Sequence, residues 1–285
     1  MMRNNVLGKI SEKFIEEKDL YLLLGDLGVF QSREAIKIDN YRCINYGIME
    51  QSMIGFASGI SQAGQYPIVY SITPFIIERC FEQLKLDFGY NDCNGLIITA
   101  GGSFDYNKLG PTHFCPNDIS LIFKTNCRNI FLPWNKYDAE KFTEKILQEK
   151  CYAYLRLSSE EICNEDMPKD FAHLKKYSDK ITIGIGPDSL LIAKHFKFEL
   201  NYSISNFNEE TVRNLKKLLQ EGLHIELIAG FNLDFLLNLL NNHEESYLSS
   251  GSLKLIYSIT SKFDTAEEKI THLLSNLISN SISFK

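Results

Sequence analysis

The residues best suited to chemistry are Glu50 and His113, each of which lies just after a turn that contains glycine. Glu50 follows a short apolar run and Gly47, and it falls in the first turn of a predicted helix. Residues with little side-chain bulk recur at helical spacing along this helix: Ser52, Gly55, Gly59 and Ala63. Such a strip lets another backbone approach closely, as in a tightly packed core or a subunit interface. A carboxyl group on a buried helix is costly unless it is protonated or has a dedicated partner, so Glu50 is the first candidate for a functional acid.

The stretch from Asn45 to Gly59 resembles the pyrimidine-binding domain of the transketolase family, whose turn reads approximately N-x-G-I-x-E-Q-x-M-x-G-x-A-x-G. The matching positions are Asn45, Gly47, Ile48, Glu50, Gln51, Met53, Gly55, Ala57 and Gly59. The resemblance implies that Glu50 activates thiamine diphosphate: a protonated carboxyl group donates to pyrimidine N1', and the protein keeps that group neutral in an apolar pocket. The alternative is that Glu50 only stabilises the helix N-terminus through the helix dipole.

A second motif, residues 70–75, resembles the family's turn Y-S-x-(x-)P/T-F. The resemblance implies that Phe75 stacks on the aminopyrimidine, that Phe81 adds to the pocket wall and that Tyr70 binds substrate. The alternative is that both phenylalanines are core aromatic residues. Arg79 belongs to a family pattern R-x-x-D/E-Q, which indicates a structural or interfacial role rather than a catalytic one.

A third motif ends at His113 and resembles the family's G-P-T-H signature, in which the histidine faces the thiazolium and contacts substrate oxygens. Histidine suits this role because it donates, accepts or transfers protons near neutral pH. The commoner family pattern carries Asp where Leu109 stands and Gln where Phe114 stands. Because that Asp binds a hydroxyl group, its loss leaves open whether the acceptor is an ordinary sugar phosphate of the pentose pathway.

Two further residues match family positions at the ends of predicted strands. Arg156 follows Tyr154-Leu155 and resembles an arginine that binds substrate phosphate; an arginine–carboxylate ion pair at the surface is the alternative, and the sequence leaves both open. Asp26 matches a family aspartate after the first strand, where a structural or interfacial role is expected.

The chain lacks the motif with which thiamine enzymes hold Mg²⁺ and diphosphate, which is G-D-G followed after a spacer by Asn. Gly25-Asp26-Leu27 has no second glycine, and no set of metal ligands is predicted. The resemblance therefore implies a partner, an N-terminal transketolase subunit that carries G-D-G…N. It implies an α2β2-type assembly in which thiamine diphosphate and Mg²⁺ are held mainly by that partner.

The elements that must position these residues alternate between strand and helix, which predicts an α/β fold with two doubly wound, mostly parallel sheets. Ligands of such sheets bind beyond the carboxyl ends of the strands, where all three motifs lie. We expect a pyrimidine-binding domain at 1–157, a linker at 158–180 and a smaller α/β domain at 181–285. The predicted strands are 19–24, 43–46, 66–71, 95–100, 129–133, 152–157, 181–185, 199–205, 224–229 and 253–260. The predicted helices include 75–88, 116–124, 136–149, 209–221, 233–240 and 266–278, one that starts at 50 and one that starts at 188.

The composition of the 285 residues is that of an ordinary globular protein, with 44% hydrophobic and 23% charged residues and a net charge of −6. The absence of a basic stripe argues against nucleic acid, and the absence of a long apolar run argues against a membrane segment. No signal peptide is recognisable, so we expect a cytoplasmic protein. The 7 cysteines are scattered, which favours reduced thiols over disulfides or a zinc site.

The sequence as a whole predicts the C-terminal subunit of a thiamine diphosphate-dependent, two-chain transketolase. It would transfer a two-carbon ketol unit from a ketose or ketose phosphate to an aldehyde. The alternatives are a subunit similar to deoxyxylulose phosphate synthase or to the β chain of a 2-oxo acid dehydrogenase, and a non-catalytic scaffold. The sequence leaves the donor, the acceptor and the pathway open.

Overall fold

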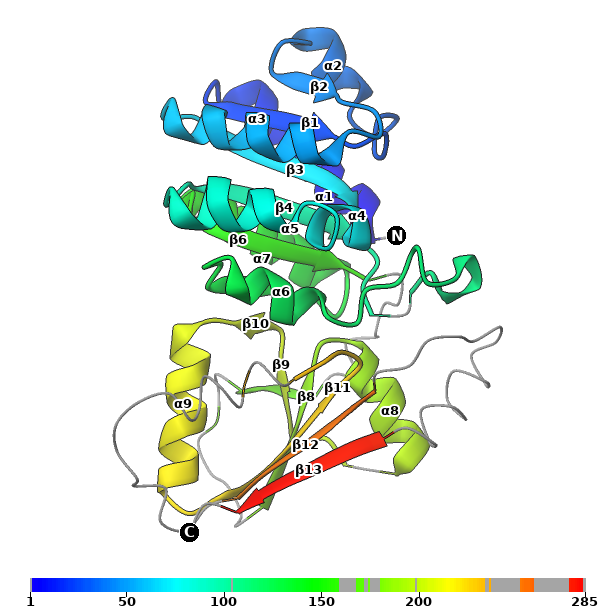
Figure 1. The fold of residues 1–285 in the computed structure, drawn as a ribbon, viewed down its shortest axis with the longest axis vertical. Coiled ribbons are helices and arrows are strands. Elements are labelled where there is room, and N and C mark those ends of the chain that lie inside the picture. Colours follow the sequence, from blue (N-terminus) through cyan, green and yellow to red (C-terminus); the bar gives the residue numbers. More distant parts are fainter. Residues whose placement is uncertain are drawn as a thin grey trace.

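A computed structural model of the chain describes residues 2–103, 105–158, 168–171, 174, 180–197, 199–233, 236, 252–258 and 277–283. These residues form two mostly parallel sheets, one above the other in the view of Figure 1, each with helices packed on its faces. The predicted fold class is thereby confirmed.

The first sheet has the strand order β10-β5-β6-β4-β3-β1-β2 and is parallel except for its edge strand β10. Its strands are β1 (Leu20–Leu24), β2 (Cys43–Asn45), β3 (Tyr66–Ile72), β4 (Gly95–Ala100), β5 (Asn129–Phe131), β6 (Tyr152–Leu157) and β10 (Asn206–Phe207). Every residue of the central strands β4 and β6 is buried, because helices cover both faces of the sheet.

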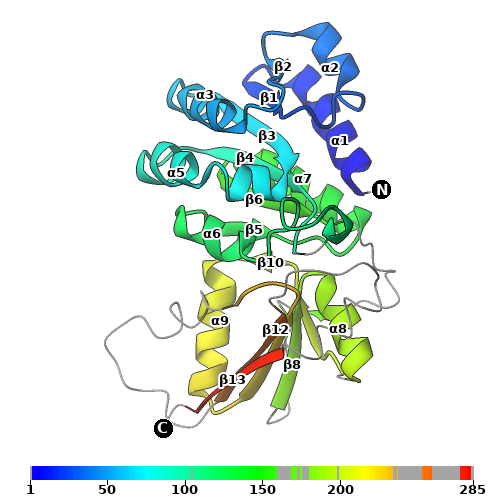
Figure 2. The ribbon, with the colours of Figure 1, turned by 45° about the vertical axis from the view of Figure 1, so that its right-hand side comes forward.

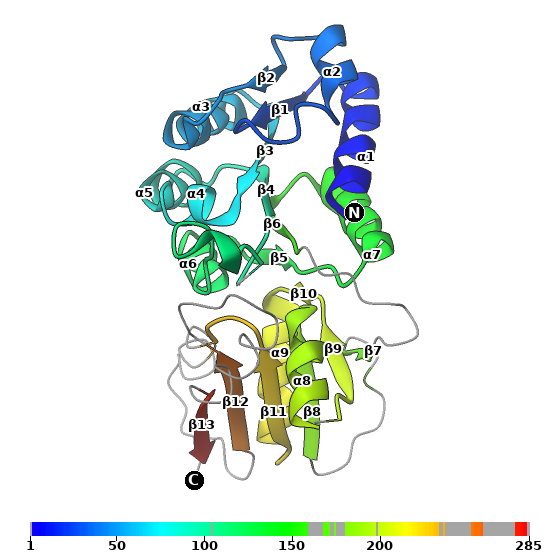
Figure 3. The same cartoon turned by 90° about the vertical axis from the view of Figure 1, so that its right-hand side faces the viewer.

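Helices lie on both faces of the first sheet, as Figure 3 shows. One face carries α3 (Glu50–Gln62), α4 (Thr73–Ile77), α5 (Phe81–Gln83) and α6 (Asp118–Lys124). The other face carries α1 (Met2–Glu16), α2 (Arg33–Ile38) and α7 (Lys136–Glu149). Of the predicted site residues, Glu50 begins α3 and Phe75 lies in α4, both at the carboxyl ends of the strands.

The second sheet has the order β13-β12-β11-β8-β9-β7, and only the pair of β12 and β13 is antiparallel. Its strands are β7 (Lys169–Asp170), β8 (Lys180–Ile185), β9 (Tyr202–Ile204), β11 (His224–Ala229), β12 (Ser252–Ser258) and β13 (Leu277–Ser283). Its helices α8 (Asp188–Phe196) and α9 (Glu209–Gln220) pack on opposite faces, as Figure 2 shows. Asn208 caps α9, since its side chain accepts a hydrogen bond from the Thr211 N–H at 2.9 Å.

The helix predicted over 75–88 is divided in the structure. Helix α4 ends at Ile77, residues 78–80 form a turn, and α5 continues into the π-helix η1 (Leu84–Tyr90). Close packing accompanies this change, because Gly89 in η1 lies against the carbonyl of Thr125, where a side chain has no room. The turn matters for the site because it holds Arg79.

The second part of the chain differs from the prediction in three places. Residues 277 and 278 belong to the antiparallel strand β13, so the prediction of a helix up to 278 is wrong at its end. The remainder of that helix and most of the one predicted over 233–240 lie outside the described residues. Strand β7 falls within the predicted linker, most of which is likewise not described, and β10 pairs with β5 of the first sheet.

The state of the cysteines and the search for membrane-spanning helices concern the described residues only. The six cysteines among them are all free thiols, and Cys163 lies outside them. None of the described helices is both long enough and apolar enough to cross a membrane.

Candidate functional site

Glu50 begins α3 at the carboxyl-terminal edge of the first sheet, where Leu24, Asn45 and Tyr70 end or nearly end three paired strands. The turn before it depends on Gly47, whose φ of +66° is a left-handed conformation that favours glycine. Asn45 holds this turn, because its Oδ1 accepts hydrogen bonds from the backbone N–H groups of Gly47 (3.1 Å) and Asp26 (3.0 Å). The Asp26 side chain takes part in the same turn, because its Oδ1 accepts a hydrogen bond from Asn45 Nδ2 at 3.1 Å, and its structural or interfacial role stays a prediction.

The carboxyl group of Glu50 is buried, at 2% exposure for the residue, and has two side-chain partners. Ser71 Oγ donates to its Oε1 at 3.3 Å, and Arg79 Nη1 donates to its Oε2 at 2.6 Å. Of the two conditions that the sequence left open for a buried carboxyl group, protonation or a dedicated partner, the structure shows a partner. The prediction of an apolar pocket around Glu50 is wrong for this structure, because a guanidinium forms a charge-assisted hydrogen bond with the carboxyl group.

Arg79 connects Glu50 to two aromatic residues. The centre of its guanidinium lies 4.3 Å from the centroid of the Phe75 ring. The Phe75 ring meets the His113 ring edge-on, with centroids 5.2 Å apart and an interplanar angle of 69°. Glu50 therefore contacts Arg79, Arg79 contacts Phe75, and Phe75 contacts His113. The fold thus brings together three residues that the sequence singled out, from α3, α4 and the loop after β4.

His113 lies in a loop that fixes its ring. Its Nδ1 is 2.8 Å from Thr112 Oγ1, and its backbone N–H donates to the carbonyl of Gly110 at 3.1 Å. Gly110 has a φ of +80°, so this turn also favours glycine. With Nδ1 paired to Thr112, Nε2 is the ring atom that can meet a substrate oxygen. Leu109, in the same loop, is 59% exposed.

Three contacts that the sequence did not reveal position these groups. The Thr73 hydroxyl donates to the carbonyl groups of Ala100 and Gly101, which ties the start of α4 to the end of β4. Gln51 Nε2 donates to the carbonyl of Arg79 at 3.2 Å and so supports the turn after α4. In the helix predicted over 75–88, the four-residue spacing of Phe75 and Arg79 places them on one face, and this spacing was the available signal for their contact.

Tyr70 lies apart from this site, contrary to the prediction that it binds substrate. Successive residues of a strand point to opposite faces, so Tyr70 faces away from Ser71, which contacts Glu50. The Tyr70 side chain packs beside Leu7 of α1 around Gly28, and the residue is 1% exposed. Among the described residues, the ring contacts of Phe75 do not extend to Phe81, whose role in the pocket wall stays a prediction.

Arg156 lies inside the molecule where the two sheets meet, and its side chain is 0% exposed. Its Nη1 lies 3.3 Å from both carboxylate oxygens of Asp118, and the Tyr154 hydroxyl donates to Asp118 Oδ2 at 3.1 Å. From the second part of the chain, Asp188 Oδ2 is 3.9 Å from Arg156 Nη2, and the Phe231 ring centroid is 4.8 Å from the guanidinium. Burial alone would lower the pKa of Arg156, but the carboxylates of Asp118 and Asp188 raise it above its ordinary value. The structure therefore shows an arginine–carboxylate pair, as the alternative expected, but inside the molecule rather than at its surface.

The small residues of α3 face outward from the described part of the chain rather than into its core. A side chain at Gly59 would meet no atom within 4 Å, and one at Gly55 would meet only Asp87 Oδ2, at 3.8 Å. Large apolar side chains on and near α3 are also exposed: Ile48 (72%), Met49 (56%), Phe56 (43%), Leu86 (43%) and Tyr90 (84%). Of the two roles expected for the small-residue strip, core or subunit interface, this placement favours the interface.

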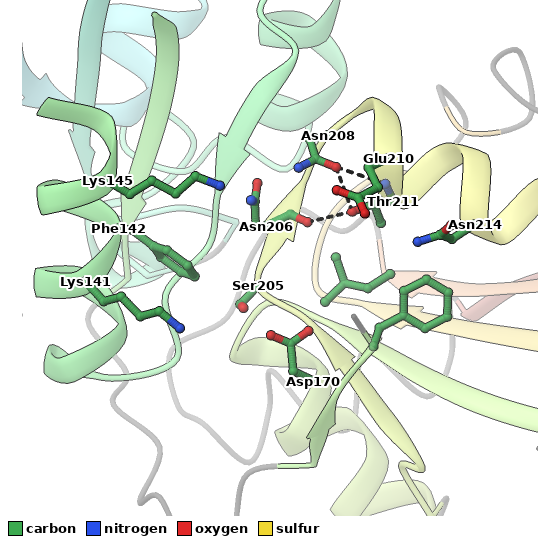
Figure 4. Close-up of a pocket in the computed structure, with 12 residues that line it drawn as sticks. Lys141, Phe142, Lys145, Asp170, Ser205, Asn206, Asn208, Glu210, Thr211 and Asn214 are labelled. Carbon is green, nitrogen blue, oxygen red and sulfur yellow. Dashed lines mark hydrogen bonds between the residues drawn. The ribbon is translucent and has the colours of Figure 1, made fainter. Parts of the chain in front are cut away.

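A separate cavity of about 260 Å³ lies between α7 and the segment from β9 to α9, as Figure 4 shows. Lys141 and Lys145 extend toward it from α7, whereas Asp170 and Glu210 reach it from the second part of the chain. Its wall therefore carries both signs of charge. Its lining from the first part of the chain comes from α7, a helix that Figure 3 shows on the face opposite α3 and α4, and none of the predicted site residues lines the cavity.

Comparison with known proteins identifies the family to which the chain belongs. Residues 14–164, more than half of the chain, match the family model described as "Transketolase, pyrimidine binding domain". An uncharacterized 33.6 kDa protein in the fasciation locus of Rhodococcoides fascians is 33% identical over 139 residues, 49% of this chain and 45% of that protein. A subunit of the apulose-4-phosphate transketolase of Actinobacillus succinogenes is 29% identical over 121 residues, 42% of this chain and 39% of that protein. The aligned region thus spans less than half the length of either relative.

A solved structure described as "Split gene transketolase, inactive beta4 tetramer" is similar in fold over nearly the full length. The TM-score is 0.66 at 16% identity, and the match covers 96% of this chain and 97% of that chain. At this identity the likeness concerns the fold alone, and it includes both sheets. Together with the match over residues 14–164, it means that the chain belongs to the transketolase family, and the family's pyrimidine-binding domain covers those residues.

Proposed function

We propose that this chain is the C-terminal subunit of a thiamine diphosphate-dependent, two-chain transketolase. The observation that carries the proposal is the convergence of Glu50, Phe75 and His113 at one edge of the first sheet. The chain that contains them has no G-D-G…N motif for diphosphate and Mg²⁺. The proposal therefore gives this chain the pyrimidine end of the cofactor and gives a partner the diphosphate end.

The residues at this edge fit the aminopyrimidine in chemical type. Glu50 offers a buried carboxyl group that would donate a hydrogen bond to pyrimidine N1', and Phe75 offers an aromatic face that orients a flat ring. Thiamine diphosphate, when bound, would supply the carbon centre that accepts the two-carbon unit. His113 would then bind substrate oxygens and move protons to or from them, as its fixed Nδ1 and available Nε2 allow.

The outer surface of α3 supports a partner subunit at this edge. Gly55 and Gly59 have space around them that the described residues do not fill, and the large apolar side chains beside them are exposed. An apolar surface with closely approachable backbone is typical of an interface between subunits. We infer an α2β2-type assembly in which the N-terminal subunit covers this surface and brings the ligands for Mg²⁺ and diphosphate.

The proposed reaction moves a two-carbon ketol unit from a ketose or ketose phosphate to an aldehyde acceptor. A relative named as a subunit of apulose-4-phosphate transketolase supports a sugar phosphate substrate outside the common pentoses. The exposed Leu109, where the family's commoner pattern has Asp, agrees with a specialised acceptor, because this position offers no hydrogen bond to a hydroxyl group.

The test is hydrogen–deuterium exchange at thiazolium C2 in the complex of this chain with its partner. Glu50→Gln should slow exchange by roughly 10²–10⁴-fold, because Gln donates a hydrogen bond to N1' but cannot transfer a proton. Glu34→Gln, which changes an exposed glutamate on α2, is the matched control and should exchange at the parental rate. Normal exchange in Glu50→Gln would mean that Glu50 only stabilises the start of α3.

A calorimetric titration tests the division between two chains. The isolated chain should bind thiamine diphosphate with Mg²⁺ poorly, and the complex should bind it well, because the diphosphate ligands lie on the partner. Micromolar affinity of the isolated chain would contradict the two-chain proposal.

A further inference from the structure

The guanidinium of Arg79 contacts both groups that the pyrimidine is proposed to use. It donates to Glu50 Oε2 at 2.6 Å, and its centre lies 4.3 Å from the centroid of the Phe75 ring. A flat ring that stacks on Phe75 and bonds to Glu50 needs the same space. The aminopyrimidine and the Arg79 side chain therefore cannot both occupy this position.

A guanidinium suits this position because it is planar, stacks on aromatic rings and donates hydrogen bonds in its plane. The guanidinium donates hydrogen bonds, whereas pyrimidine N1' accepts one. Glu50 can pair with Arg79 as a carboxylate but needs a proton to donate to N1'. When the pyrimidine replaces Arg79 as the partner of Glu50, Glu50 therefore takes up one proton from solvent. Burial raises the pKa of the neighbouring Cys80 thiol to about 12, so this thiol stays neutral and does not take part at neutral pH.

Arg79 is the mobile member of this contact. Its side chain is 41% exposed, whereas that of Glu50 is 1% exposed. Arg79 also lies in the turn between α4 and α5, where Gln51 holds its carbonyl group but not its side chain. The guanidinium can therefore move into solvent while Glu50 and Phe75 stay in place.

We propose that Arg79 fills the aminopyrimidine position in the chain without cofactor, so that thiamine diphosphate binds only by displacing the guanidinium from Glu50 and Phe75. This inference rests on the proposed function, because it assigns a regulatory contact to the same site. Arg79 is then a gating residue: it keeps the buried carboxylate paired before assembly, and its contacts are given up when the cofactor enters.

The first experiment measures thiamine diphosphate affinity, with Mg²⁺, by calorimetry on the complex of the full chain with its partner. Arg79→Ala should bind about tenfold more tightly than the parent, a moderate effect because the guanidinium that must be displaced is partly solvated. Arg79→Lys should lie between the two, since an ammonium pairs with Glu50 but does not stack as a plane. Titration in two buffers of different ionisation enthalpy should show proton uptake by the parent complex.

Arg33→Ala is the matched control. Arg33 lies 4.4 Å from the Phe30 ring centroid and 3.5 Å from Glu34, so it has the same two kinds of contact away from the site. Its removal should leave the affinity unchanged. Weaker or equal binding by Arg79→Ala would overturn the inference, because either result means that Arg79 does not compete with the cofactor.

The second experiment does not depend on the cofactor. Methylguanidinium at millimolar concentration should raise the melting temperature of the Arg79→Ala chain, because it refills the vacated position. It should have no such effect on the parent or on Arg79→Ala combined with Glu50→Gln. If the complex failed to bind thiamine diphosphate but this stabilisation were observed, the proposed function would fail while the planar-cation site would stand. Equal responses of all three chains would refute the site itself.

Discussion

Two arginine–carboxylate contacts in this molecule differ in how completely the chain encloses them. Arg79 and Glu50 lie at an open edge of the first sheet, where the arginine side chain is 41% exposed. Arg156 and Asp118 lie where the two sheets meet, and both side chains are 0% exposed. The residue types are similar, yet only the first contact can open without disturbing the core.

The enclosure of Arg156 comes from both parts of the chain. Asp118 and Tyr154 approach it from the first sheet, and Asp188 and Phe231 approach it from the second. At the edge around Glu50, by contrast, the Arg79 side chain keeps 41% of its surface exposed while it contacts Glu50 and Phe75. We infer that the inner contact holds the two parts together, whereas the outer one is available for function.

The largest effect expected from this comparison is on stability. Arg156→Met should lower the free energy of unfolding by about 3–5 kcal/mol, because it leaves Asp118 buried without a cation. Arg79→Met should cost less, about 1–3 kcal/mol, because Glu50 stays buried but keeps the hydrogen bond from Ser71. Urea denaturation of both variants measures the difference. Combining Arg156→Met with Asp118→Leu should recover part of the loss, because an apolar pair leaves no buried charge. Equal losses from Arg156→Met and Arg79→Met would erase the distinction between the two contacts.

The next effect is on chemistry rather than stability. His113→Ala should lower ketol transfer in the assembled complex by roughly 10²-fold, the range for one positioned acid–base group, while C2 exchange stays nearly intact. Its unfolding free energy should match that of the parent, because the loop lies at the open edge. Transfer at the parental rate would remove His113 from the site. An equal loss of exchange and transfer would place it in the cofactor pocket itself.

Alanine substitutions of two glycines, one beside the enclosed Arg156 and one on the open surface of α3, test the same comparison with smaller expected effects on stability. Gly102→Ala should destabilise the chain by about 1–3 kcal/mol, because a Cβ at this position would overlap the aliphatic part of Arg156. Gly59→Ala should instead stabilise the isolated chain by about 0.5–1 kcal/mol, since the helix gains an alanine and no atom lies within 4 Å. The same Gly59→Ala change should weaken assembly with the partner. Thermal unfolding and sedimentation measure the two effects, and a destabilising Gly59→Ala would contradict the open surface.

The smallest effect concerns a third pair, in the segment between α2 and β2. Arg42 Nε donates to Asp39 Oδ2 at 2.7 Å, and this hydrogen bond lowers the pKa of Asp39. A lowered folded pKa stabilises the protein above the ordinary aspartate value of about 3.9, and the contribution is lost as the pH falls through the folded pKa. The stability difference between the parent and Asp39→Asn should therefore be present at pH 7 and should shrink in acid. Urea midpoints across this pH range would show it, and a difference that does not change with pH would argue against the pair.

The amino-acid sequence by itself determined the features that depend on neighbouring residues. Strand–helix alternation predicted the α/β fold, and the run around Glu50 predicted the turn at Gly47 and the start of α3. The meeting of Glu50, Phe75 and His113 was also predictable, because the carboxyl ends of parallel strands share one edge of a sheet. Each of these inferences uses local geometry or a rule that holds for all sheets of this kind.

Only the tertiary structure decided which side chains reach that edge and which are enclosed. Alternation along β3 places Tyr70 and Ser71 on opposite faces, but only packing against α1 and α3 determines which of them faces Glu50. Arg156 matches a substrate-binding position in sequence, yet Asp188 and Phe231, which enclose it, are distant along the chain. The physical reason is that burial and ion pairing depend on which elements pack together, and such contacts leave no local pattern in the sequence.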